Sequence, residues 1–72
     1  MKPIPLLATV ALVADLPEHK LTKGQIGTVV EHLGSAGDEA LLVEFSDGQG
    51  RAYAMVALTA DQVMVLHREH AA

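Results

Sequence analysis

The chain has 72 residues, half of them apolar, and a formal net charge of −4, so it has room for one small core and we expect a single domain over residues 1–72. The absence of cysteine excludes disulfides and thiolate zinc sites, and the acidic balance makes nucleic acid an unfavourable partner. No apolar stretch approaches the roughly 20 residues of a membrane span, and we expect a cytoplasmic protein that does not bind a membrane.

Apolar runs of strand length, separated by turn signals, predict an all-β fold. The first strand is expected at residues 8–14, after a peripheral lead-in at residues 1–7. A long loop is expected at residues 15–25, because Pro17 has no N–H to donate to a strand ladder. No segment shows a sustained helical stripe, so no long helix is predicted.

The second strand is expected at residues 26–33, which are rich in β-branched side chains. Gly24 lies just before this strand and Gly27 lies inside it. A glycine inside a strand indicates a β-bulge or the close approach of another backbone segment. Both glycines are therefore expected to have structural roles.

Two hairpins are expected on either side of the third strand. Residues 34–39 are polar and contain glycine, as a hairpin connection requires, and Gly48 follows an aspartate in a strong turn signal. Between these turns, Leu41, Val43 and Phe45 share one face of an alternating strand. These three side chains are expected in the core, and Gly48 is expected to form the second turn.

The fourth strand, expected at residues 51–58, is apolar on both faces. Strand alternation places Tyr53 and Met55 together on one face. The opposite face carries Ala54, Val56 and Leu58. Because this second set suits a crowded interior, we expect Tyr53 and Met55 to face outward.

Thr59 with Gln62 three residues later predicts a one-turn 3-10 connector, followed by a last strand at residues 63–66. Residues 67–72 are expected to form a polar tail. An apolar sheet of five short strands can bury its inner face only by curling on itself. The sequence therefore predicts a small five-stranded SH3-like barrel with a long loop after its first strand.

Four segments, residues 15–19, Gly24, 27–30 and 43–45, resemble a bacterial family of small proteins known as domain of unknown function 4926. The resemblance spans nearly the whole chain and implies no activity and no catalytic residue. The spacing of Leu21, Gly24, Gly27 and Val29 is also similar to that of KOW, Tudor-like and other SH3-like barrels. This second resemblance implies a fold, in which the glycines admit the chain to a sharply bent strand.

No catalytic, cofactor or metal site is expected. The four histidines, which are the only soft metal ligands, fall in three separate regions: His19, His32, His67 and His70. Ser35 and Ser46 lie beside glycine-bearing turns, where serine is common without any catalytic role. Two pairs of carboxylates, Asp38 with Glu39 and Glu44 with Asp47, lie in hairpins or on an outward strand face, where they are not expected to gain the shifted pKa of a general acid. The chain is therefore predicted not to be an enzyme.

Surplus apolar side chains predict that the chain binds a protein partner or a second copy of itself. We expect the interaction surface to include Tyr53, Met55, Leu16 and His19. One alternative is a KOW-like RNA-binding module, which Lys20 and Lys23 favour and the net charge opposes. Another is an accessory subunit that completes the active site of a partner enzyme.

Overall fold

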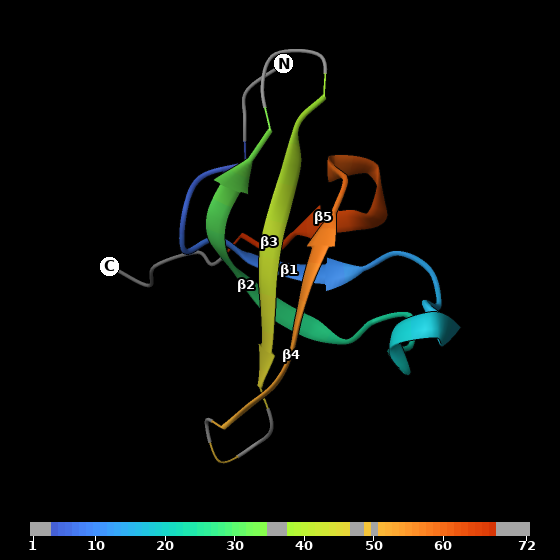
Figure 1. Ribbon diagram of the computed structural model, residues 1–72. Coiled ribbons are helices and arrows are strands. Elements are labelled where there is room, and N and C mark those ends of the chain that lie inside the picture. The colour runs from blue at the N-terminus through green and yellow to red at the C-terminus, as the bar shows by residue number, and fades with distance from the viewer. Residues whose placement is uncertain (1–3, 35–37, 47–48, 50, 68–72) are drawn as a thin grey trace.

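The computed structural model describes residues 4–34, 38–46, 49 and 51–67 (Figure 1). Over this part of the chain it is all-β, with five antiparallel strands in the order β4-β3-β2-β1-β5 and two 3-10 turns. The strands are β1 (Thr9–Leu12), β2 (Ile26–Leu33), β3 (Ala40–Ser46), β4 (Ala52–Leu58) and β5 (Val63–Val65), and the 3-10 turns are η1 (Pro17–His19) and η2 (Ala60–Gln62).

The five predicted strands occur where the sequence placed them, with β1 shorter than expected. β1 ends at Leu12, and Val13 instead donates its N–H to the carbonyl of Gln62 at 3.1 Å. Gly48, which is predicted to form the second turn, and most of the predicted polar tail lie outside the described residues.

The sheet bends because β2 contains both a glycine and a bulge. A Cβ added at Gly27 would lie 2.7 Å from Val43 Cγ1 and 2.9 Å from the carbonyl oxygen of Glu44, so the expected close approach is confirmed. The β-bulge occurs three residues later, where the register shifts between Val29 and Glu31. Figure 1 shows β2 curving between its neighbours, so that β1 crosses behind β3 and β4.

The core lies inside this bend and is aliphatic apart from one ring. Val43 and Phe45 are fully buried and Leu41 nearly so, which confirms the alternation predicted for β3. Val56 and Leu58 of β4 are also buried, and Ala54 packs against the same cluster, as expected.

The loop at residues 15–25 is closed by two leucines that enter the core. Leu16 and Leu21 exchange backbone hydrogen bonds of 2.9 Å and 3.1 Å, which close the loop around η1. This closure directs both side chains inward, and their exposed fractions are 9% and 1%. The prediction that Leu16 lies on the interaction surface is therefore wrong, because its side chain belongs to the core.

Two smaller predictions about turns are settled by hydrogen bonds and backbone angles. The Thr59 N–H donates to Gln62 Oε1 at 2.9 Å, which confirms the capped one-turn connector at η2. Gly24 has φ +90°, a conformation that side chains rarely adopt, and this explains its place at the end of the loop.

The lead-in is held more closely than expected. Ile4 packs against the core cluster, and its carbonyl oxygen lies 2.5 Å from His32 Nε2. Leu7 donates its N–H to the carbonyl of Val29 at 2.6 Å. Residues 4–8 therefore continue the packing of β1 along β2 rather than lying apart from the sheet.

Candidate interaction surface

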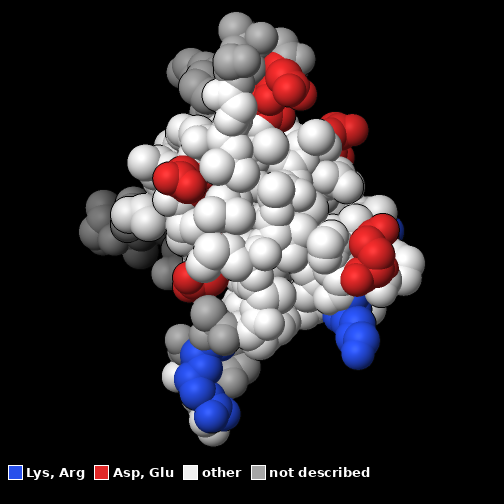
Figure 2. Space-filling model, in the orientation of Figure 1, with Lys and Arg blue, Asp and Glu red and all other residues white. Residues whose placement is uncertain are grey.

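Large apolar side chains remain exposed on several elements of this small sheet. Seven of them have exposed fractions between 41% and 74%: Leu6, Leu7, Val13, Ile26, Tyr53, Met55 and Met64. In Figure 2 a broad uncharged surface occupies the centre of the view, with acidic groups distributed around it. Exposed apolar side chains of this size mark candidate contact surfaces when several lie close together.

Tyr53 and Met55 are half exposed, at 52% and 53%, in agreement with the predicted outward position. However, the register between β3 and β4 shifts after Phe45, where Ser46 pairs with Ala52 and leaves Tyr53 as the extra residue of a bulge. A bulge interrupts strict alternation. Met55 therefore has a partner on β3, whereas Tyr53 has none, and the two side chains do not follow the regular alternation that the sequence predicts.

Tyr53 is directed toward the end of the 15–25 loop. Its hydroxyl oxygen accepts a hydrogen bond of 2.6 Å from Gln25 Nε2. The Oε1 atom of Gln25 in turn accepts the Thr22 N–H at 2.6 Å, and Asp15 Oδ1 accepts the Lys23 N–H at 2.8 Å. These bonds attach β4 to the loop and fix the position of the half-exposed tyrosine ring.

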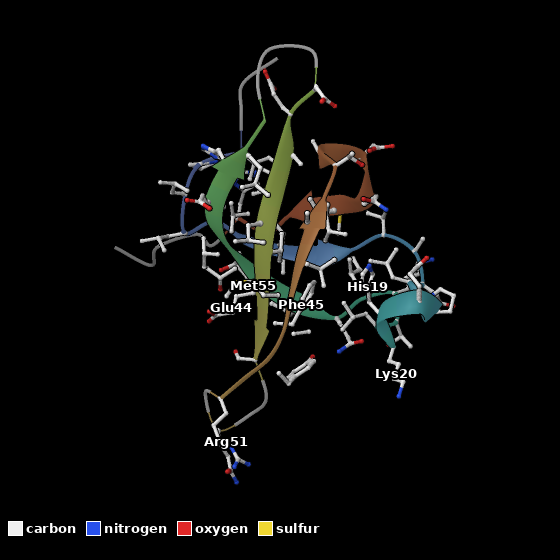
Figure 3. All side chains as sticks on the ribbon, in the orientation of Figure 1. His19, Lys20, Glu44, Phe45, Arg51 and Met55 are labelled. Atoms are coloured by element: carbon white, nitrogen blue, oxygen red, sulfur yellow. The ribbon has the colours of Figure 1, made fainter. Side chains whose placement is uncertain are left out.

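Met55 lies opposite Glu44, which in turn pairs with Thr28 of β2. Figure 3 labels Met55 and Glu44 close together on β4 and β3, with His19 and Lys20 well apart from them on the η1 turn. Met55 therefore adds an apolar contact surface beside a carboxylate, at the outermost strand of the sheet.

A second apolar feature was not predicted. Ile26 of β2 and Met64 of β5 both pair with Ala11 of β1, so the three side chains form a row across three strands. Ile26 and Met64 are 55% and 56% exposed and leave Ala11 only 7% exposed. The apolar residues Ile26, Val29 and Val30 fall on both faces of β2, so their spacing gave no signal that Ile26 faces outward.

The remaining predicted site residue, His19, is exposed at the end of η1. Lys20 and Lys23 are exposed on the same loop, and Figure 3 places Lys20 far from Arg51. Figure 2 likewise shows the basic groups of this view at separate edges. On the visible face the fold does not gather these cations into one patch of the kind that binds a phosphate backbone.

Within the described residues, no group of three or more His, Cys, Asp or Glu side chains is arranged to hold a metal ion. The same residues include no buried polar or charged side chain. Nor does this part of the chain contain a helix with the length and apolar character required to cross a membrane.

These features define a small all-β domain with half-exposed apolar side chains and a loop at residues 15–25 that is hydrogen-bonded to β4. A family model described as domain of unknown function (DUF4926) matches residues 6–65. The chain belongs to this family, as its sequence motifs suggested. Neither the comparison with curated proteins nor that with solved structures gave a match.

Proposed function

We propose that the chain is a non-enzymatic binding module, built as an SH3-like barrel, that recognises a protein through Tyr53, Met55 and the 15–25 loop. The single observation that carries the proposal is the half exposure of both side chains on an outer strand that has no charged residue. Tyrosine and methionine are enriched at the centres of protein interfaces, where they bury large areas.

The order of elements supports the barrel part of the proposal. A long loop follows β1, a 3-10 turn separates β4 from β5, and β5 returns to pair with β1. This order of elements is the one expected of a strongly bent sheet that encloses its apolar face, and it therefore supports the proposed barrel. The bend at Gly27 and the bulge after Val29 supply the curvature that such a barrel requires.

The hydrogen bond between Gln25 and Tyr53 supports the use of strand and loop as one surface. It fixes the tyrosine next to a loop that is itself anchored by Leu16 and Leu21. A preorganised surface loses less conformational entropy when a partner binds. His19 and the two lysines of the loop would then provide polar contacts at the edge of this surface.

Tyr53→Ser combined with Met55→Ser is expected to weaken self-association or partner binding by about 1–3 kcal/mol, because truncation of interface anchors has costs of this size. The fold should persist, since both side chains are half exposed. Sedimentation of the purified chain and co-purification from the native cell measure the two kinds of association, and thermal melting measures the fold.

A matched control is available in Met64→Ser, to be compared with Met55→Ser. It removes an apolar side chain of nearly equal exposure from β5, which lies at the opposite end of the strand order from β4. Binding that is lost in the control but kept in the first variant would contradict the proposed surface. Retention on RNA that falls with salt and requires Lys20 and Lys23 would instead support the RNA-binding alternative.

A further inference from the structure

We propose that two copies of the chain associate by pairing the open edges of their β4 strands, in an antiparallel register centred on Val56. The inference rests on the proposed protein-binding role and identifies the partner as a second copy. β4 is the last strand of the sheet on its side, and within the described residues only β3 pairs with it. An open edge presents unpaired N–H and C=O groups to any strand that can approach.

The direction in which the N–H and C=O groups of β4 point can be worked out strand by strand, starting from the hydrogen bonds that β2 makes with residues 7 and 8. Val29 donates its N–H to the carbonyl of Ala8 at 3.0 Å and accepts the Leu7 N–H at 2.6 Å, so its polar groups point away from β3. Backbone groups of successive residues point to opposite sides of a strand. Thr28 and its partner Glu44 on β3 therefore direct their groups toward each other.

The same alternation carries through β3 to β4. Val43, next to Glu44, directs its groups toward β4, where Val56 is its partner. Met55 and Ala57, on either side of Val56, then direct their N–H and C=O groups to the open edge. A two-fold axis at Val56 places Met55 of one copy opposite Ala57 of the other. This register uses the edge groups of both residues in both copies.

The side chains fit this register in size. Met55 lies opposite the small Ala57 of the second copy, Ala54 lies opposite Leu58, and Val56 meets Val56. Each large side chain therefore has a small one across from it, as close strand pairing requires. The bulge at Tyr53 lies outside this stretch, so residues 54–58 keep the regular pairing with β3 on which the register depends.

The chemistry of the edge favours another copy of the same strand. Ala52–Leu58 contains no charged residue and no proline, which are the features that commonly prevent edges from pairing. Each copy has a net charge of −4, so repulsion between copies opposes association, and added salt is expected to strengthen it. A short interface of this kind should give a dissociation constant of roughly 1–100 μM.

Sedimentation velocity of the full chain over a range of concentrations tests the inference. Ala57→Pro removes an edge donor without removing a bond to β3, and is expected to raise the dissociation constant by at least about tenfold. Ala57→Ser is the matched control, because it keeps the N–H and should leave association nearly unchanged. Thermal melting shows whether each variant retains its fold.

A second pair of variants keeps the test decisive if the proline variant does not fold. Met55→Lys places a charge on the open edge of β4 and should weaken the dimer. Met64→Lys makes the same change on β5 at nearly the same exposure and should not weaken it. A wild-type chain that stays monomeric up to about 1 mM would overturn the inference but not the proposed binding of another protein. A dimer that is sensitive to Tyr53→Ser and insensitive to Ala57→Pro would overturn edge pairing while supporting the proposed surface.

Discussion

Phe45→Ala is expected to lower the free energy of unfolding by about 3–5 kcal/mol, the cost of removing a buried aromatic ring. Phe45 is fully buried and is the only phenylalanine of the chain. Its neighbours across the sheet are Gly27 on β2 and Ala54 on β4. Neither small neighbour can extend a side chain into the space that the ring would leave, so the cavity should persist.

This loss is large relative to the total stability of the domain. At roughly 0.05–0.15 kcal/mol per residue, a chain of 72 residues has about 4–11 kcal/mol to lose. Chemical denaturation measures the loss, and Phe45→Leu, which fills part of the cavity, should unfold at an intermediate concentration of denaturant. Met55→Ala on the exposed side of β4 should change stability by no more than about 0.5 kcal/mol. A loss below about 1.5 kcal/mol for Phe45→Ala would show that the core can collapse around the missing ring.

The sequence predicted the core of β3 well because this strand alternates cleanly. Leu41, Val43 and Phe45 occupy every second position, and the period of two gives one face without ambiguity. The connector at η2 was predictable for a similar reason, since Thr59 and Gln62 interact within a single turn. Both features depend on residues that are near one another in the chain.

Features that depend on distant segments were not predictable in the same way. Leu16 looks like a surface residue in a proline-containing loop, and only its pairing with Leu21 directs it into the core. The exposed row of Ile26 and Met64 exists because β1 lies between β2 and β5. The bulge at Tyr53 likewise depends on how Ser46 pairs with Ala52, which alternation within β4 does not reveal.

Close contacts, and not backbone angles, are what require glycine at position 27. Its backbone is not among those with positive φ, so alanine could adopt the same conformation. An added Cβ would nevertheless meet Val43 Cγ1 at 2.7 Å, the Glu44 carbonyl oxygen at 2.9 Å and Phe45 Cδ1 at 3.0 Å. The valine methyl can be removed by mutation, whereas the carbonyl oxygen belongs to a strand held between β2 and β4.

Gly27→Ala is therefore expected to destabilise the fold by about 1–3 kcal/mol, as overpacking of a filled core does. Gly24→Ala should also destabilise, but for a different reason, because Gly24 has φ +90° and open space around it. Denaturation of single and double variants with Val43→Ala separates the two causes. Val43→Ala should relieve part of the cost at Gly27, with a coupling of at least about 0.5 kcal/mol, and should be additive with Gly24→Ala. Additivity at both positions would show that contact with Val43 is not what requires glycine in β2, and would leave the Glu44 carbonyl and the Phe45 ring as the limiting neighbours.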